Sequence, residues 1–335
     1  MAKKEQVNTE MGKLFQNSSL KSISTVWDLG FHFLDGKNLR LCNEWEDCVD
    51  VVFRINYYND FIIPETIPIN GENYTVTEIG EFSFPRTMES IYIPNSIIKI
   101  GKGAFCFHPH SRLSKILVSQ DNRYYDSREN CNAIIETASN TLIAACNNTV
   151  IPESVERIQA CAFCAVTLKS FYVGSNIVSI DYGFGDFFGL EAIKVSKDNR
   201  HYDSREDCNA IIETATNTLV KGCIKTKIPI SVKKLGISSF STIEELETII
   251  IPSNIKYIDD YAFRNCISLK SIDIPESVKM IGDRAFYNCG LASVAIKNKK
   301  AKIHRTAFDS KVIINGRPLD YWVDPKKDYL DLNKE

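Results

Sequence analysis

The sequence predicts a β-rich solenoid, in which short repeats stack into an elongated array, and three observations support this fold class. First, eight phenylalanines, each preceded by a small residue, recur mostly 21 to 23 residues apart. Second, an alternating apolar pattern follows them. Third, the two wider gaps, of 58 and 56 residues, hold copies of one insert. Such a period is typical of solenoids, whose turns bury their apolar sides only by stacking on their neighbours. The phenylalanine column comprises Phe84, Phe105, Phe163, Phe184, Phe240, Phe263, Phe286 and Phe308.

The segment after each phenylalanine predicts a parallel strand. In the cleanest copy, Leu269, Ile272 and Ile274 point to one side, while Ser271 and Asp273 point to the other. Alternation with a period of two is typical of a half-buried strand. Successive copies would place one strand in each turn, and these strands would form a continuous parallel sheet. A proline near the end of most copies lacks an N–H and would stop the ladder there.

A glycine follows an aliphatic residue at the corner of several repeats. This step predicts either a positive φ or a close approach of two backbones. Two copies depart from the pattern, because Gln159 replaces the corner glycine and the copy at Asp181 is one residue out of step before Phe184. We therefore expect distorted turns at those two places. The corner glycines are Gly80, Gly101, Gly236 and Gly282.

The two wide gaps in the phenylalanine column contain nearly the same sequence twice. Residues 122–149 and 199–226 match at most positions, with a constant offset of 77 residues. In each copy, two short apolar runs flank a turn rich in Thr, Asn and Ala, which predicts a hairpin. We place the two hairpin inserts at residues 119–150 and 196–228.

These two motifs resemble the BspA-like leucine-rich repeat family, which is found in gut Bacteroides and some protozoa. The resemblance rests on the repeat I-P-x-S-V-x-x-I-G-x-x-A-F-x-x-C-x-x-L-x-x-I and on the insert YDSRENCNAIIETASNTLIAAC, and it covers roughly residues 50–310. It implies a right-handed leucine-rich repeat array. In exported members it implies adhesion or binding to host proteins, and it implies no catalytic residues.

The ends of a solenoid must be covered, because a terminal turn exposes its apolar side. Asp35-Gly36, between two apolar runs, predicts a hairpin, which together with Trp27 and Trp45 would form an N-terminal cap. Tyr321 and Trp322 would close the other end. We therefore expect a flexible tail at 1–20, an N-terminal cap at 21–73, the solenoid at 74–315, and a C-terminal cap and tail at 316–335.

Composition excludes several classes of protein. A net charge of −2 gives no general attraction to nucleic acid or to anionic membranes. No apolar run approaches the roughly 20 residues that a membrane-spanning helix needs. The first residues, MAKKEQVNTEMGKLFQNSS, lack the apolar core of a signal peptide. We expect a cytoplasmic protein on this evidence, or a surface or secreted protein if a leader has been removed.

Eleven cysteines raise the question of metal or redox chemistry. Cys266 and Cys289 share one repeat position, where a thiol packs as a small hydrophobic group. Cys161 and Cys164 form a C-x-x-C motif with Phe163 between them, so we interpret both as repeat residues. Zinc would require a second pair nearby.

Two further pairs, Cys131 with Cys146 and Cys208 with Cys223, lie symmetrically about the two predicted hairpin turns. Residues opposite each other on paired strands are close enough for a disulfide. The alternative is a pair of packed thiols, which the absence of an export signal favours. The sequence leaves both possibilities open.

No catalytic or cofactor-binding pattern is recognisable in the sequence. It has no phosphate-binding loop, nucleophile elbow or dinucleotide fingerprint. His108 and His110 are clustered, but no carboxylates accompany them at metal-binding spacing. Asp126 and Asp203 offer oxygen ligands in the two inserts, yet without the spacing of an EF-hand they are expected to form turn hydrogen bonds. We therefore expect no enzyme, no cofactor and no metal.

The outward side of the predicted strands is the candidate binding surface. Tyrosines and large aliphatic residues, beside small residues such as Ser90 and Ser170, are typical of a protein-binding face. Single exposed apolar residues are common, however, and strands favour aromatic and β-branched residues anyway. We expect a protein or glycan partner, and the alternative is a cytoplasmic scaffold that associates with itself. The predicted binding residues are Tyr92, Leu117, Tyr172, Lys194, Ile250 and Asp273, followed in the same column by Ala295.

Overall fold

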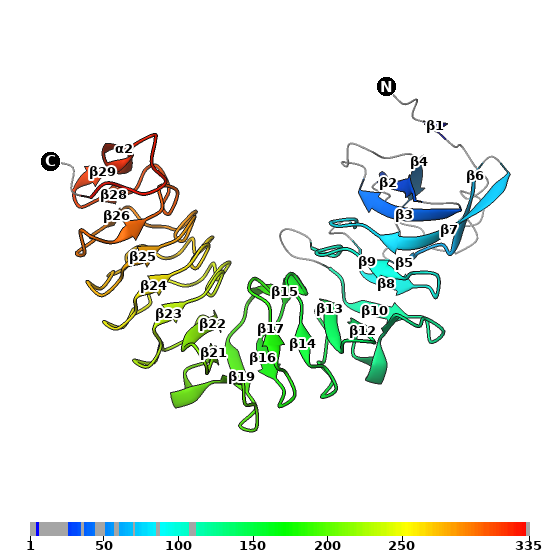
Figure 1. Cartoon of the computed structure of the whole chain (residues 1–335), viewed down its shortest axis with the longest axis horizontal. Helices are drawn as coiled ribbons and strands as arrows, with labels where there is room; N and C mark the ends of the chain where they lie inside the picture. The colour runs from blue at the N-terminus through cyan, green and yellow to red at the C-terminus, as the bar shows by residue number, and fades with distance from the viewer. Residues whose placement is uncertain are drawn as a thin grey trace. The chain divides into compact units, whose positions relative to one another are not determined.

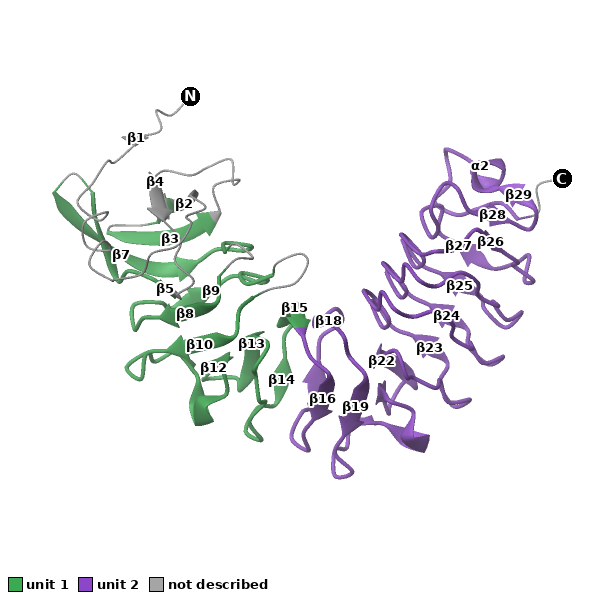
Figure 2. Cartoon of the chain, turned by 180° about the vertical axis from the view of Figure 1, so that it is seen from behind, with its two compact units in different colours: residues 1–166 green, residues 167–335 purple. Residues whose placement is uncertain are grey.

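The computed structural model is built from short strands with almost no helix, and it divides into two compact units (Figure 1; Figure 2). Unit 1 is Met1–Val166 and unit 2 is Thr167–Glu335. The structure describes residues 5–6, 26–34, 37–43, 51–56, 60–69, 71–84, 88–106 and 112–332.

Unit 1 opens with a sheet in the strand order β1-β4-β2-β3-β7-β6, with β9 beside β7. A second sheet, β10-β8-β5, is entirely parallel. A third, β11-β12-β13-β14, holds the antiparallel pair β12–β13. The strands are β1 (Glu5–Gln6), β2 (Val26–Phe33), β3 (Asn38–Asn43), β4 (Val51–Asn56), β5 (Asp60–Ile62), β6 (Thr66–Ile69), β7 (Glu72–Ile79), β8 (Ser90–Ile93), β9 (Lys99–Ile100), β10 (Lys115–Val118), β11 (Tyr125–Asp126), β12 (Ala133–Glu136), β13 (Thr141–Ala145) and β14 (Arg157–Ile158), with β15 (Phe163–Thr167) at the boundary.

Unit 2 repeats these themes, with a parallel pair β16–β19 and a longer sheet β20-β21-β22-β23-β24-β25-β27. Each insert also has a 3₁₀ turn, η1 (Arg128–Asn130) in unit 1 and η2 (Arg205–Asp207) in unit 2. The elements are β16 (Ser170–Val173), β17 (Ser179–Ile180), β18 (Gly185–Phe188), β19 (Ala192–Val195), β20 (Tyr202–Asp203), β21 (Ala210–Glu213), β22 (Thr218–Gly222), β23 (Lys234–Leu235), β24 (Tyr257–Ile258), β25 (Met280–Ile281), β26 (Ser293–Val294), β27 (Lys302–Ile303), β28 (Ile313–Ile314), β29 (Arg317–Pro318) and α2 (Leu319–Trp322).

The terminal segments expected to act as caps differ in how fully they are described. At the N-terminal end, β2 and β3 pair in an antiparallel arrangement, while Asp35-Gly36 and Trp45 lie outside the described residues, as does the side chain of Trp27. At the C-terminal end, Trp322 is buried, and its Nε1 donates a hydrogen bond to the carbonyl oxygen of Ile314 at 3.0 Å. The proposed cap boundaries therefore stay predictions.

The phenylalanine column is buried in every copy, as predicted. In unit 1 the rings of Phe84 and Phe105 stack with centroids 5.0 Å apart. In unit 2, Phe240, Phe263, Phe286 and Phe308 form one run of nearly parallel rings with centroids 5.0 to 5.1 Å apart. One turn therefore adds one ring to the stack.

The copy at Phe184 is distorted, as its sequence predicts. The ring of Phe184 is tilted against Phe171 and lies edge-on to Phe187. Its left-handed residue, Gly183, comes one position before the phenylalanine, whereas Ser238 comes two positions before Phe240. The distortion expected at Gln159 is not seen: its N–H donates to the carbonyl oxygen of Leu142 at 3.0 Å, as Gly236 donates to Leu219 at 2.9 Å in unit 2. This bond uses the backbone alone, so the side chain of Gln159 leaves it intact.

The corner glycines are required by close backbone approach, because none of these four has a positive φ. A Cβ on Gly101 would lie 2.7 Å from the nitrogen of Glu81, and a Cβ on Gly282 would lie 2.5 Å from the nitrogen of Asp260. Real Cβ atoms do not approach backbone this closely, so consecutive turns touch at these corners. Of the two explanations that the sequence allows, a positive φ and a close backbone approach, the structure supports the close approach.

The expectation of one strand at the same place in every turn is wrong for part of unit 2. Leu269 and Ile274 are buried as the alternation requires, but their segment forms only an isolated bridge, between Ile274 and Ile296. Backbone hydrogen bonds between these turns are made elsewhere. They lie at the corner strands β23, β24, β25 and β27 and in the phenylalanine turns, where the N–H of Phe263 donates to Ala285 at 2.7 Å. These two ladders hold neighbouring turns together, while the third side contributes the isolated bridge.

One asparagine in each insert bonds to an earlier turn through its side-chain amide. The Nδ2 of Asn122 donates to the carbonyl oxygens of Pro94 and Ile97, at 2.8 and 3.0 Å. Asn199 makes the equivalent bonds to Gly174 and Ile177, at 2.7 and 2.9 Å. The asparagine Oδ1 accepts two backbone N–H groups in both copies. All hydrogen-bonding groups of the side-chain amide are therefore occupied.

Candidate functional site

Three apolar side chains line up across the outer face of the β5-β8-β10 sheet in unit 1. Strand register places Ile62 beside Tyr92 and Tyr92 beside Leu117. Ile62 is 58% exposed, Leu117 is 38% exposed and Tyr92 is half-buried. Ile91, which directly precedes Tyr92 and points to the other face, is buried. Parallel neighbours lie about 4.8 Å apart. The three side chains therefore form a continuous apolar row, which we call the outer row.

Unit 2 brings together two other predicted binding residues. Tyr172 on β16 pairs with Lys194 on β19. Tyr172 is 52% exposed, and Lys194 is exposed as well. A large aromatic side chain and a cation thus lie next to each other on one sheet.

The remaining predicted residues do not join a strand. Ile250 is 84% exposed and Asp273 is exposed, but both lie in segments without regular strand pairing. The structure pairs Tyr92 with Leu117 and Tyr172 with Lys194, and it gives no comparable register for the other two. Whether any of these residues bind a partner stays a prediction.

Sequence reasoning did not include Ile62 among the binding residues. The signal was present, because Phe61-Ile62-Ile63-Pro64 ends in the same Ile-Pro step as Ile91-Tyr92-Ile93-Pro94. The predicted N-terminal cap, residues 21–73, includes this segment, so its Ile-Pro step was not counted among the repeats. In the structure, β5 pairs in parallel with β8.

A groove of about 540 Å³ lies beside Lys194, between β19 and the insert of unit 2. Its lining includes Lys194, Lys197, Asp203, Arg205 and Asp207. Arg205 donates to both oxygens of Asp203, at 2.8 and 2.6 Å. These hydrogen bonds hold both side chains in place at the side of the groove. The groove is therefore lined by both cationic and carboxylate side chains.

The acidic residues considered as metal ligands are held by arginines. In unit 1, burial would raise the pKa of Asp126, but hydrogen bonds from Arg128 outweigh it and lower that pKa. Arg128 donates to the two Asp126 oxygens at 2.8 and 2.6 Å. These carboxylates therefore organise the insert turn, as expected from the sequence. His108 and His110 lie outside the described residues.

The insert cysteines are four buried thiols, and none of them is bridged. The register predicted from the sequence, with Cys131 opposite Cys146, is wrong. A bulge between Ile134 and Ile135 shifts the pairing by one residue, so that Ala133 lies opposite Ala145. Cys146 Sγ consequently donates to the carbonyl oxygen of Asn132 at 3.2 Å. The same shift occurs at Ile211 and Ile212 in the second copy.

Burial of these thiols predicts a loss of stability in alkali. Burial raises the pKa of Cys131 from 9.0 to about 11. A raised folded-state pKa stabilises the protein below pH 9.0, and this contribution is lost as the pH rises through about 11. The stability deficit of Cys131→Ala relative to the parent should therefore shrink by about 1–2 kcal/mol across this window, measured by urea unfolding. Ile134→Val, at a fully buried position three residues further along the chain, should show a constant deficit. An unchanged deficit for Cys131→Ala would contradict the assignment.

Cys266 and Cys289 are buried in the core of unit 2, as the packed-thiol interpretation predicts. Their Sγ atoms donate to the carbonyl oxygens of Phe240 and Phe263, at 3.2 and 3.0 Å. Each thiol therefore bonds to the preceding phenylalanine turn, and the repeat position has a structural role.

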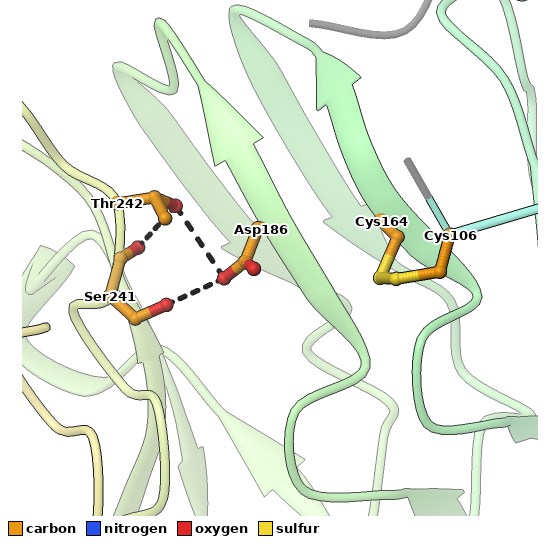
Figure 3. Close-up of a disulfide and its surroundings, with 5 residues drawn as sticks. All are labelled: Cys106, Cys164, Asp186, Ser241 and Thr242. Carbon is orange, nitrogen blue, oxygen red and sulfur yellow. Dashed lines mark hydrogen bonds between the residues drawn. A yellow bond between two sulfur atoms is a disulfide. The ribbon is translucent and has the colours of Figure 1, made fainter. Parts of the chain in front are cut away.

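A disulfide joins Cys106 to Cys164, with Cα atoms 5.0 Å apart (Figure 3). Interpreting Cys164 only as a packed repeat residue was therefore wrong. The available signal was positional, because Cys106 follows Phe105 as Cys164 follows Phe163. Equivalent positions of stacked turns are neighbours, although 58 residues separate these two cysteines. Cys161 lies beside the bridge, and the three sulfur atoms are within 4.8 Å of one another.

Unit 2 also contains a buried polar cluster that sequence reasoning missed. The Ser241 hydroxyl donates to an Asp186 carboxylate oxygen at 2.5 Å (Figure 3). Lys221 is buried, and its Nζ donates to the carbonyl oxygens of Ser238 and Ser241 at 3.2 and 3.4 Å. Burial lowers the Lys221 pKa, while the Asp186 carboxylate opposes that shift. The lysine joins the carbonyl oxygens of one phenylalanine turn, which is a structural role.

Within the described part of the chain, no helix has the length and apolar character needed to cross a membrane.

Comparison with known families identifies the repeat. The profile of the BspA type leucine rich repeat region matches six copies, over residues 65–182, 134–211 and 209–315. Similar solved structures include a leucine-rich repeat protein from Eubacterium ventriosum, with 18% identity, a TM-score of 0.45, and coverage of 84% of this chain and 74% of that one. A leucine rich cell surface protein from Faecalibacterium prausnitzii has 18% identity and a TM-score of 0.38 over 89% and 96% of the two chains. The pneumococcal vaccine antigen PcpA has 15% identity and a TM-score of 0.43 over 86% and 84%. No curated protein matches.

Proposed function

Because the chain belongs to the BspA-type leucine-rich repeat family, we propose that it is a non-enzymatic module that binds a protein or glycan partner, in adhesion or host interaction. The observation that carries this proposal is the outer row. Ile62, Tyr92 and Leu117 come from three consecutive parallel strands and lie side by side.

The outer row suits a protein partner for two reasons. A three-stranded parallel sheet holds the side chains rigidly, so little conformational entropy is lost on binding. Tyrosine is enriched in binding hot spots, and contiguous exposed apolar side chains mark interaction sites. A single exposed apolar residue would need no explanation, but three in direct register form a contiguous surface.

The test compares a charge placed in the outer row with the same charge elsewhere in unit 1. Leu117→Glu is expected to weaken capture of a partner from host-cell or bacterial extracts by more than about tenfold, because it buries a charge in the interface. The control is Val150→Glu, since Val150 is 72% exposed and lies outside the strand face. Both variants should melt at the parent's temperature. Equal recovery of every partner by both variants would rule out the outer row as the binding site.

The groove beside Lys194 favours a glycan as the second candidate partner. Tyr172 supplies an aromatic surface next to the groove, and Lys194, Asp203 and Asp207 supply polar groups. Tyr172→Ala is expected to weaken binding at this site by about 1–2 kcal/mol with little change in melting temperature. Binding to an array of glycans measures this, with Leu117→Glu as the control that should leave glycan binding intact. Full glycan binding by Tyr172→Ala would exclude this surface.

Self-association through an exposed edge of the solenoid is the alternative function. It predicts a molar mass that rises with concentration in sedimentation experiments, that changes when a solenoid end is altered, and that stays the same in Leu117→Glu. A parent protein that stays monomeric would exclude the scaffold and leave a heterologous partner as the remaining proposal.

A further inference from the structure

Three cysteines meet at one place in unit 1. Cys106 follows Phe105, while Cys161 and Cys164 flank Phe163 in another phenylalanine turn. Their sulfur atoms all lie within 4.8 Å of one another, and all three residues are half-buried. Two of them share the disulfide. The cluster is therefore within reach of small reductants and ions from solvent.

The repeat itself does not require cysteine at these positions. Where Cys106 and Cys164 follow their phenylalanines, other turns have Ser241, Arg264 and Tyr287. Where Cys161 precedes its phenylalanine by two, other turns have Ser238, Tyr261 and Arg284. These are mostly polar residues, in contrast to the buried position of Cys266 and Cys289. Packing between turns explains the latter pair, whereas the three clustered cysteines occupy positions that other turns fill with mostly polar residues.

The turn geometry preorganises the C-x-x-C pair. Cys161 has the left-handed backbone that is common to this repeat position, with φ of 63° against 56° at Ser238. The N–H of Cys164 donates to the carbonyl oxygen of Cys161 at 3.3 Å, which closes the turn between the two thiols. The N–H of Cys106 donates to Gly103 at 2.8 Å. All three cysteines are thus carried on hydrogen-bonded backbone.

We propose that this cluster is a redox-controlled zinc site, in which Cys106, Cys161 and Cys164 bind one Zn²⁺ as thiolates once the disulfide is reduced. Zinc–thiolate bonds of about 2.3 Å place the sulfurs of a tetrahedral site about 3.8 Å apart. A cluster already confined to 4.8 Å needs only a small side-chain adjustment. The fourth position is taken by a water molecule or another ligand from outside the cluster.

The disulfide is reduced first, and zinc binds afterwards. A phosphine reductant is oxidised to its oxide with oxygen from water, and the bridge gains two electrons and two protons to become two thiols. Zinc binding then releases the three thiol protons to solvent, because the thiolate is the metal ligand. A two-electron oxidant that re-forms the Cys106–Cys164 bond removes two ligands and expels the metal.

The test uses the full chain, reduced with a phosphine under anaerobic conditions and titrated with Co²⁺ as a spectroscopic probe. The expected result is one cobalt per chain with a thiolate-to-cobalt charge-transfer band and the visible bands of a tetrahedral ion, all displaced by Zn²⁺. Elemental analysis should then find one zinc per chain. The unreduced protein should bind neither ion at this stoichiometry.

Cys161→Ser is the decisive variant, because it removes a ligand and keeps the bridge. Its affinity for zinc in the reduced state should fall by more than about tenfold, whereas Cys208→Ser, a buried insert thiol, should bind like the parent. Cys106→Ser provides a second ligand deletion if Cys161→Ser folds poorly, and circular dichroism checks both. A reduced, folded parent without the charge-transfer band would overturn the proposal. So would unchanged zinc affinity in both ligand variants, or a Cys161–Cys164 bridge found by mass spectrometry in place of metal binding.

Discussion

Phe263→Ala is expected to lower the free energy of unfolding by about 3–5 kcal/mol. Phe263 is fully buried, with Phe240 on one side at 5.0 Å and Phe286 on the other at 5.1 Å. Removing the ring would leave a cavity between two stacked rings whose turns are fixed by backbone hydrogen bonds, so the site cannot collapse to fill it. Chemical denaturation of the parent and the variant measures the loss.

The matched control is Tyr287→Ala, which removes an aromatic ring that is exposed on the same array of turns. It should change stability by no more than about 0.5 kcal/mol. If the two variants lost similar, small amounts of stability, the ring stack would not be the core that holds the turns together.

Gly282→Ala is expected to cost about 2–3 kcal/mol, because the added methyl group meets backbone. Its Cβ would lie 2.5 Å from the nitrogen of Asp260 and 2.8 Å from the carbonyl carbon of Asp259. These atoms belong to the preceding turn and cannot rotate away as a side chain would. Relief requires that two turns separate at their contact, which weakens the β24–β25 ladder.

Lys279→Ala serves as the comparison for Gly282→Ala, because Lys279 is exposed in the same turn and its backbone N–H still donates to Lys256. Thermal unfolding should place Lys279→Ala close to the parent and Gly282→Ala well below it. Equal melting temperatures for the two variants would show that the turns can yield at this corner.

The repeat, its buried phenylalanines and its family could be predicted from the sequence because they depend on periodicity and apolar character. Phe240 and Phe308 had to be buried wherever the turns stacked. The course of the backbone between turns was harder to predict. Nothing in the residues around Leu269 distinguishes them from those around Ile91, yet only the latter lie in a regular strand. Which side of a turn forms the ladder depends on how neighbouring turns fit together.

The pairing of the cysteines was also hard to predict from the sequence. A bulge at Ile134 moves Cys131 out of register with Cys146, and a sequence does not display a bulge of one residue. The Cys106–Cys164 bridge was predictable in principle, since both cysteines follow a column phenylalanine. It required comparing equivalent repeat positions across a gap of 58 residues, where spacing alone suggests no contact.

The asparagine that fastens each insert bears on how this chain could have grown. Asn122 and Asn199 bond to backbone carbonyl oxygens of an earlier turn, outside the repeated segment, and every residue supplies such an oxygen whatever its side chain. A duplicated insert therefore brings the asparagine that bonds it to the array, and no side chain elsewhere must change to accept these hydrogen bonds. An array with such inserts can gain or lose whole segments by recombination while neighbouring turns keep the same hydrogen bonds. The length of the array can then vary between related proteins faster than the sequence of any single turn.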